Sequence, residues 1–496
     1  MKSLFRPSRY PRGLPTLLVL AALSETVYII GFLRQFPLVR YYTGDTDMGT
    51  ITGHSHAGYD LFVGSITVSF VLLAFAWYHI HGVGDDRLVP WILATAAVFA
   101  VTLVFVYPIT AIDIFAYVDQ SWIMVHYHQN PIFVPPAAFP ADPLMHLSDG
   151  WSGAGAPYGP LGLVIDALPV LVARGDLLWS LVLLKIFFSA MLLLSAYLVY
   201  RVLRQVAPGR ALEGLVLVAW NPMVLFETSA NGHNDIAMMV FALFALLVIV
   251  EGDLVFGVVL LAAACLIKFA TLILLPLFVV YGLTRLPRAR VRLRFAVLSF
   301  ASSLAVATAA YARFWQGPDT LAHLVTQNQR YLDSFSSVVM DFGGPGVRGD
   351  QAALVGRVLF LCAYVVAIVL CTRDAQGFLR GCFLAMFAFL AFGLTNVESW
   401  YAIWPVLLAA TVPTAGERLT GIVLAWGISL GAAFYGYEWW WRGLGTPGAF
   451  AYVNNKSYLL SFVPSSVALV LLAFWPRLGR ALAGRFERKR PAEIGG

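Results

Sequence analysis

Apolar runs of roughly 18 or more residues recur along almost the whole chain, and each is long enough to cross a lipid bilayer as a helix. Hydrophobic residues make up 59% of the 496 positions and charged residues 12%, whereas soluble domains carry about 25% charged residues. We therefore predict an all-α, polytopic bundle of about 12–14 transmembrane helices, organised as a single integral membrane domain over residues 1–496.

The basic residues predict how these helices are oriented. With the N-terminus inside, the inner loops hold about two thirds of the 33 Lys and Arg residues, as expected for cytoplasmic loops. We therefore predict a multi-pass protein of a bacterial-type plasma membrane with both termini in the cytoplasm and no nucleic-acid partner. The hydrophobic segments are 14–36, 58–80, 89–110, 177–201, 213–229, 235–250, 254–268, 270–284, 294–314, 353–372, 380–396, 400–413, 419–437 and 457–475.

The long polar loops all fall on the predicted outer face, which indicates that the protein acts there. The longest, 111–176, begins with "DIFAYVDQSWIMVHYHQ", an amphipathic pattern typical of a helix lying on the membrane surface. A Pro-rich turn follows, and then an apolar segment at 157–173 that is short for a span. We predict that this segment is a second surface helix or a re-entrant helix.

Several ionisable residues stand at or within predicted spans near the outer face, where such residues are functional candidates by default. If the spans gather into one bundle, these side chains meet at similar depth. They are Asp113, Asp235 with its neighbours His233 and Asn234, Lys268, and Glu398.

Each candidate also has a structural explanation. Asp113 and Asp235 stand where helices begin, so either can cap a helix and interact with its dipole. Lys268 can extend its ammonium group to the membrane interface, and Glu398 can be an ordinary loop carboxylate. Convergence on one membrane face favours the functional interpretation, because independent caps have no reason to share a face.

The order of these motifs resembles the GT-C superfamily of membrane glycosyltransferases, in particular the bacterial polyprenol-phosphomannose-dependent mannosyltransferases. Asp113 of "DIFAYVDQ" matches the catalytic acidic position, with Tyr117 four residues later. The stretches "NPIFVPP", "PYGPLG", "WNPMVLFETSANGHNDIAMM" and "LIKFATLILLP" follow in the order of those enzymes. The resemblance implies a core at 89–413, two additional spans at 1–88, and C-terminal spans with a basic cytoplasmic tail at 414–496.

This resemblance implies transfer of a hexose, with mannose as the first choice, from a polyprenyl-phosphate donor to a glycan or glycolipid acceptor at the outer face of the lipid bilayer. Asp113 is the implied general base of an inverting reaction, and no metal or other cofactor is expected. Lys268 is the first choice to stabilise the leaving phosphate, and Arg330 the second. The other predicted substrate-binding residues are Tyr117, Tyr158, His233, Asn234, Asp235 and Glu398.

Two other classes of protein fit parts of the pattern. A transporter or lipid-linked sugar flippase also has many spans with intramembrane charges, although paired halves with matching broken helices are not visible here. A ligase or polymerase that uses a lipid-diphosphate donor fits Arg330 and Arg348 in the late outer loop 316–352.

Overall fold

The computed structural model describes residues 11, 13–43, 46, 48–53, 55–147, 151–321, 331–344, 346–435 and 455–472. Within these ranges the regular secondary structure is helical, which confirms the predicted all-α class. Extended pairing among the described residues is limited to two isolated β-bridges, Pro37 with Val106 and Leu332 with Asn396. Both bridges prove to lie beside the candidate site.

The first half of the chain forms helices whose longest members, α4 and α8, have 25 and 30 residues. The helices are α1 Leu14–Tyr28, α2 Leu38–Tyr41, α3 Met48–Thr52, α4 His56–Ile80, α5 Val89–Val104, α6 Asp113–Val125, α7 Pro160–Ala173, α8 Leu177–Val206, α9 Ala211–Ala219, α10 Pro222–Leu225 and α11 Asp235–Glu251.

The second half continues with helices of 8 to 23 residues up to the last described helix. They are α12 Leu254–Cys265, α13 Leu275–Arg285, α14 Ala289–Tyr311, α16 Phe335–Phe342, α17 Gly349–Cys371, α18 Ala375–Ala388, α19 Ile403–Thr411, α20 Ala415–Tyr435 and the helix Asn455–Leu472.

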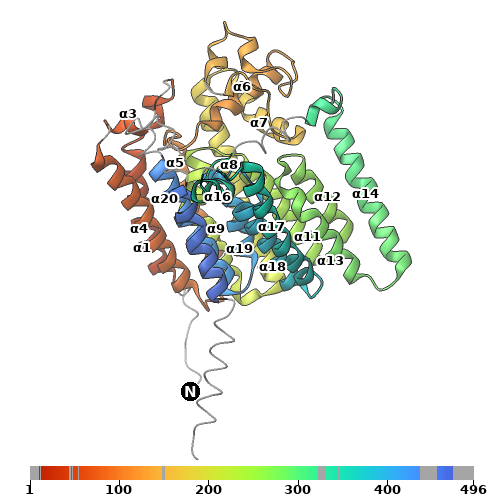
Figure 1. Cartoon of the computed structure of the whole chain (residues 1–496). Helices are drawn as coiled ribbons and strands as arrows, with labels where there is room; N and C mark the ends of the chain where they lie inside the picture. The colour runs from red at the N-terminus through yellow and green to blue at the C-terminus, as the bar shows by residue number, and fades with distance from the viewer. Residues whose placement is uncertain are drawn as a thin grey trace, which may run out of the picture.

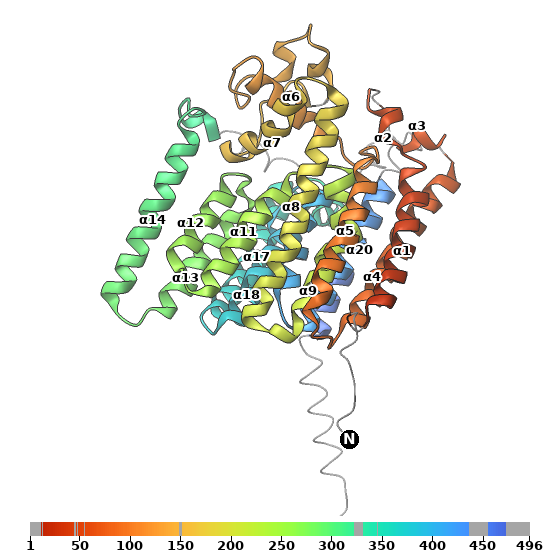
Figure 2. The same cartoon turned by 180° about the vertical axis from the view of Figure 1, so that it is seen from behind.

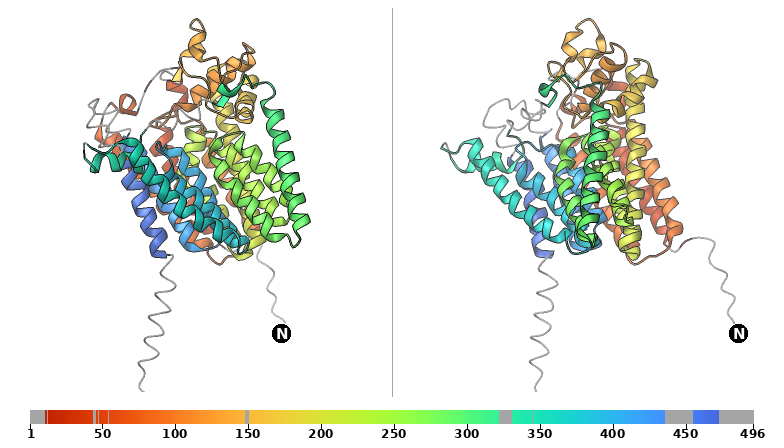
Figure 3. Two further views of the ribbon diagram at one scale, coloured as in Figure 1. Left: turned by 45° about the vertical axis from the view of Figure 1, so that its right-hand side comes forward. Right: turned by 90° about the vertical axis from the view of Figure 1, so that its right-hand side faces the viewer.

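The two helices of the longest predicted outer loop, α6 and α7, form a layer at one end of the bundle (Figures 1 and 2). The beginning of α1, the loop between α13 and α14 and the end of the helix Asn455–Leu472 lie at the opposite end (Figures 1 and 3). The first and last described helices therefore start and finish on the same side, as the predicted topology requires.

Every hydrophobic segment predicted from the sequence coincides, over its described residues, with a helix or a pair of short helices. By length and composition, however, the described helices include eight that can cross a membrane, or nine if Pro208–Ala219 and Pro222–Ala230, bent by 46°, count as one span. That number is lower than about 12–14. Helices α11, α12, α13 and α19, with 17, 12, 11 and 9 residues, are short for a span, whereas α20, which is also not counted, has 21. All nine residues of α19 are buried, so its apolar sequence reflects surrounding protein.

The outer helices expose large apolar side chains. Helix α14 stands at the edge of the bundle (Figures 1 and 3) and buries only Phe295 and Ser299. Its Phe300 and Leu293 are 71% and 65% exposed. Leaving such a side chain in water rather than burying it costs about 1.5–3 kcal/mol, so helices of this kind need lipid around them. The protein is an integral membrane protein.

Buried charges join three helices at the end opposite α6 and α7. Glu213 of α9 accepts a hydrogen bond from Arg418 Nη1 of α20 at 2.7 Å and from Arg210 Nη1 at 2.8 Å. Trp77 Nε1 of α4 donates to the same carboxylate at 3.2 Å. The Arg418 and Glu213 side chains are 0% and 2% exposed, so the pair is held almost wholly inside the protein.

Candidate active site

Asp113 is the first residue of α6, and the chain that leads to it is fixed by contacts from two other parts of the fold. Tyr107 N–H donates to the backbone oxygen of Phe36 at 2.7 Å. The buried Lys185 of α8 donates from Nζ to the backbone oxygen of Val106 at 2.5 Å. The segment after α1 and the middle of α8 therefore brace the approach to Asp113.

Helix capping does not explain Asp113 or Asp235. The N-cap positions of α6 and α11 are Ile112 and Asn234, and neither helix has a side-chain cap hydrogen bond there. Both carboxylates instead interact with side chains from other segments, Asp113 with His233 and Asp235 with Lys268 and Trp404. The structure thus brings them together across the bundle, as the functional interpretation of the sequence requires.

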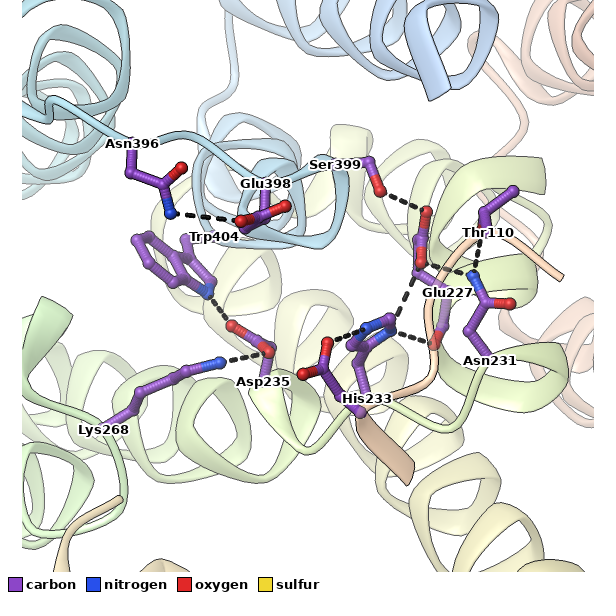
Figure 4. Close-up of polar contacts among 11 residues, drawn as sticks. Thr110, Glu227, Asn231, His233, Asp235, Lys268, Asn396, Glu398, Ser399 and Trp404 are labelled. Carbon is purple, nitrogen blue, oxygen red and sulfur yellow. Dashed lines mark hydrogen bonds and ion pairs between the residues drawn. The ribbon is translucent and has the colours of Figure 1, made fainter. Parts of the chain in front are cut away.

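A broken helix positions the "WNPMVLFETSANGHND" stretch. Asn221 Oδ1 accepts hydrogen bonds from the backbone N–H groups of Met223 and Val224 and so starts a new helix at Pro222, bent by 46° from the one before. That helix ends in a π-helical turn at 226–230, and Gly232, at φ 78°, reverses the chain. Glu227, which lies in the π-helical turn, faces the same site as the residues after Gly232 (Figure 4).

His233 links Asp113 to Glu227. Its Nε2 lies 3.4 Å from Asp113 Oδ2, and its Nδ1 lies 3.2 Å from the backbone oxygen and 3.3 Å from Oε2 of Glu227. A carbonyl oxygen only accepts hydrogen bonds, so Nδ1 carries the proton, and in neutral imidazole Nε2 then faces Asp113 without one. Burial and the nearby Lys268 lower the pKa of His233 well below its usual value, which keeps the ring neutral.

Asn231, which lies between them in the chain, and two side chains of another segment hold Glu227 and His233 in place. Asn231 Nδ2 donates to Glu227 Oε2 at 2.7 Å, and Ser399 Oγ donates to Glu227 Oε1 at 2.9 Å (Figure 4). The Trp400 ring stacks on the His233 imidazole with centroids 4.1 Å apart. The "TNVESWYAIW" turn therefore contributes to the site through more than the predicted Glu398.

Lys268 and Asp235 form the second part of the site. Lys268 Nζ donates to Asp235 Oδ2 at 2.6 Å, and Trp404 Nε1 donates to Asp235 Oδ1 at 2.6 Å. The ammonium group also lies 5.5 Å and 5.3 Å from the ring centroids of Tyr158 and Tyr401. Only 15% of the Lys268 side chain is exposed, so it is an inward-facing cation and does not extend to the interface.

Helix α7 docks on the turn that carries Lys268. The N–H groups of Gly159 and Leu161 donate to the backbone oxygens of Ile267 and Leu266 at 3.1 and 3.0 Å, which satisfies donors left free at the start of α7. Asp166 of α7 accepts a hydrogen bond from Asn234 Nδ2 at 2.8 Å.

The contact at Gly159 leads to a stability prediction. A Cβ atom there would lie 2.1 Å from the backbone oxygen of Leu266, so Gly159→Ala forces α7 and the Lys268 turn apart and costs about 1–3 kcal/mol. We expect a lower thermal unfolding midpoint in detergent than for Gly84→Ala, because nothing lies within 4 Å of a Cβ at Gly84. Equal midpoints for the two variants would contradict the docking described here.

The remaining predicted residues take different positions. Tyr158 packs edge-on against Tyr117 with centroids 5.4 Å apart, and Tyr117 is 1% exposed, so it supports Tyr158 from behind. Glu398 accepts a hydrogen bond from Asn396 Nδ2 at 3.1 Å and borders a cavity. Arg330 lies outside the described residues.

Two carboxylates of the site, Glu227 and Asp166, were not among the residues predicted from the sequence. Glu227 interrupts the apolar run 213–229, and an acidic residue inside a span is itself a signal of function. Asp166 interrupts the apolar segment 157–173 in the same way. Both acidic residues could therefore have been noticed in the sequence, but the side chains that they contact are known only from the folded structure.

Negative charge is concentrated around Asp113. Burial, followed by repulsion from Glu398, raises the pKa of Asp113 to about 7, against the opposing effect of Lys268. Burial likewise raises the pKa of Asp166 to about 7. Within the described part of the chain, no three His, Cys, Asp or Glu side chains form a metal-binding group. The arrangement offers a base poised near neutral pH with a cation close by.

The chain is similar to known proteins over the segment that contains these groups. Residues 26–284 match a family model described as "Alpha-(1->6)-mannopyranosyltransferase, N-terminal domain". This range includes Asp113, His233, Asp235 and Lys268, and ends before Glu398.

Two relatives carry the printed name Alpha-(1->6)-mannopyranosyltransferase A. The protein of Corynebacterium glutamicum is 26% identical over 226 residues, which cover 44% of this chain and 46% of the relative. The protein of Mycobacterium tuberculosis is 21% identical over 348 residues, which cover 66% of each chain. The matches thus span about half to two thirds of the relatives' own lengths.

Proposed function

Because this chain belongs to the alpha-(1->6)-mannopyranosyltransferase family that residues 26–284 match, we propose that it is a membrane mannosyltransferase. Its donor is a polyprenyl-phosphate mannose, and its acceptor is a hydroxyl of a glycan or glycolipid at the outer face of the membrane. The observation that supports this most is the meeting of Asp113, His233, Asp235 and Lys268 within the matched segment.

The proposed reaction is a single displacement. The acceptor oxygen forms a bond to the anomeric carbon while the bond between that carbon and the phosphate oxygen breaks, and polyprenyl phosphate leaves. The proton of the acceptor hydroxyl goes to Asp113, which acts as general base. No enzyme nucleophile takes part, so the configuration at the anomeric carbon inverts.

His233 assists Asp113 as the base by accepting a hydrogen bond from it after proton transfer. Its Nδ1 proton is held by the Glu227 backbone oxygen, and Nε2 is free to accept a hydrogen bond from the newly protonated Asp113. This arrangement stabilises the proton on Asp113 as it arrives. His233 is therefore a positioning residue that also disperses the proton, and Glu227 fixes its orientation.

Lys268 suits the departing phosphate. Negative charge grows on the phosphate as the bond breaks, and a cation held in place stabilises that charge most in the transition state. An ammonium group has three N–H donors, so a phosphate oxygen can bind Lys268 beside Asp235. The Tyr158 ring lies over the same cation.

The raised pKa of Asp113 predicts the pH dependence of transfer. A general base works when it is ionised, and the pKa of this carboxyl is about 7, so kcat/KM should rise about tenfold per pH unit below 7 and level off above it. Rates measured from about pH 5 to about pH 9 check this expectation. A plateau that begins near the ordinary Asp value of about 4 would contradict it.

The Lys268 assignment can be tested without leaving a buried charge unpaired. Lys268→Met alone leaves Asp235, which is 0% exposed, without its cation and so also destabilises the fold. We expect Lys268→Met with Asp235→Asn to restore most of the thermal stability but not the turnover, which should stay about 100-fold or more below wild type. Recovery of turnover together with stability would assign Lys268 a structural role.

The function itself is tested with purified protein in proteoliposomes that contain labelled polyprenyl-phosphate mannose and a soluble mannoside acceptor. The proposal predicts that the label appears in the elongated mannoside. Movement of labelled donor between leaflets without any product would instead support the flippase alternative.

A further inference from the structure

A cavity of about 250 Å³ adjoins the site. It is bordered by Thr110, Trp151, Asp333, Glu398 and Trp400 and closed by α20 and the helix Asn455–Leu472. It reaches the partners of Asp113, since Trp400 stacks on His233, and Thr110 Oγ1 accepts a hydrogen bond from Asn231 Nδ2 at 2.6 Å. Lys268, Asp235 and Tyr158 are not among its lining residues.

Asp333 is the unusual residue of this cavity. Its φ of 45° is in the left-handed region, which a residue other than glycine adopts only at a cost of about 1 kcal/mol or more. Its Oδ1 is buried and has no hydrogen-bond partner among the described residues. Buried polar atoms are normally paired, so Asp333, which borders the cavity, carries hydrogen-bonding capacity that the described residues do not use.

The backbone on both sides holds Asp333 in this conformation. Leu332 N–H donates to the backbone oxygen of Thr395 at 2.9 Å, and Val397 N–H donates to that of Leu332 at 3.0 Å. On the other side Ser334 forms a reciprocal cap with Ser337 at the start of α16. Asp333 is therefore fixed beside the segment that carries Glu398, although it is far away in the sequence.

The lining favours one chemical class of ligand. Two carboxylates accept hydrogen bonds from hydroxyl groups, and the Trp151 and Trp400 rings offer apolar faces for the C–H surface of a sugar. Two carboxylates in one cavity disfavour a phosphate or a carboxylate on the ligand beside them. The preferred occupant is an uncharged, hydroxyl-rich ring.

We propose that this cavity binds the acceptor sugar and that Asp333 is a specificity-determining residue that hydrogen-bonds its hydroxyls. The proposal rests on the mannosyltransferase function given above. The two substrates then bind at places whose side chains differ in charge. The donor phosphate binds beside Lys268, and the uncharged acceptor binds beside Asp333 and Glu398. The acceptor then approaches the reacting carbon from the side of Thr110 and Trp400.

Asp333→Gly tests this assignment, because glycine adopts the same φ without strain and removes the carboxylate. We expect the KM for a short, uncharged α-mannoside to rise about tenfold or more, with the KM for the donor unchanged and the thermal unfolding midpoint little altered. The control is Asp350→Asn, whose carboxylate is 63% exposed and paired with Arg348, and it should leave both KM values unchanged.

A second variant keeps the test decisive if Asp333→Gly does not fold. Ala432→Leu fills the cavity from α20 and should also raise the KM for the acceptor but not for the donor. A rise in the donor KM, or no change in the acceptor KM for a folded variant, would overturn the proposal. If wild-type protein transfers no mannose, the proposed function fails, and calorimetric binding of the mannoside to wild type but not to Ala432→Leu still decides the cavity.

Discussion

We expect the replacement of Asp113 with Asn to lower mannosyl transfer by about 10²–10⁴-fold, the usual contribution of a positioned general base. The substitution keeps the size of the side chain, but an amide cannot take the acceptor proton. Its NH2 group can still donate a hydrogen bond to His233 Nε2, so the substitution removes the base and can keep this contact. Rates with saturating donor and acceptor, for equal amounts of folded protein in proteoliposomes, measure the loss.

The matched control for this loss is Asp319→Asn, which changes an exposed carboxylate at the start of a short 3-10 turn. Its rate should equal that of the wild-type protein. A rate for Asp113→Asn within about threefold of wild type would show that another group takes the proton, since loss of a base typically costs far more.

The second large effect concerns stability and lies at the other end of the bundle. Replacing Arg418 with Met leaves the buried Glu213 with Arg210, whose side chain is 39% exposed, as its remaining arginine partner and should destabilise the protein by up to about 3–5 kcal/mol. The physical cause is the desolvated carboxylate that remains between α4, α9 and α20. A fall in the thermal unfolding midpoint in detergent is the measurement.

Two further variants identify the cause. Adding Glu213→Gln to Arg418→Met removes the incompletely paired charge and should recover part of the lost stability. Arg348→Met breaks an exposed pair with Asp350 and should change the midpoint little. If Arg348→Met and Arg418→Met lower the midpoint equally, burial is not what makes the inner pair important.

The sequence predicted the helical segments well because a long apolar run has few ways to satisfy its backbone in lipid other than a helix. It predicted about 12–14 spans, and length and composition identify eight or nine among the described residues. Interior helices such as α11 and α19 are apolar on all sides whether or not they cross the membrane, so hydropathy cannot separate them from lipid-facing helices such as α14.

For the site, the sequence predicted residues at helix ends and missed those whose role depends on contacts distant in the chain. Asp235 and Lys268 stand at breaks in apolar runs, where a charge is conspicuous, and the structure pairs them. The link from Glu227 through His233 to Asp113 depends on a bent helix and a π-helical turn that no spacing rule predicts. Asp333 stands out only by its backbone conformation and its unpaired oxygen, which exist only in the folded protein.

We propose that one base, Asp113, drives a single displacement on a lipid-linked mannosyl donor. The most direct test is the anomeric configuration of the new linkage, determined by nuclear magnetic resonance on product made by purified protein from a donor of known configuration. We expect a mannosylated product whose configuration is opposite to that of the donor. A product with the donor's configuration would require an enzyme nucleophile and a second displacement, and would contradict it.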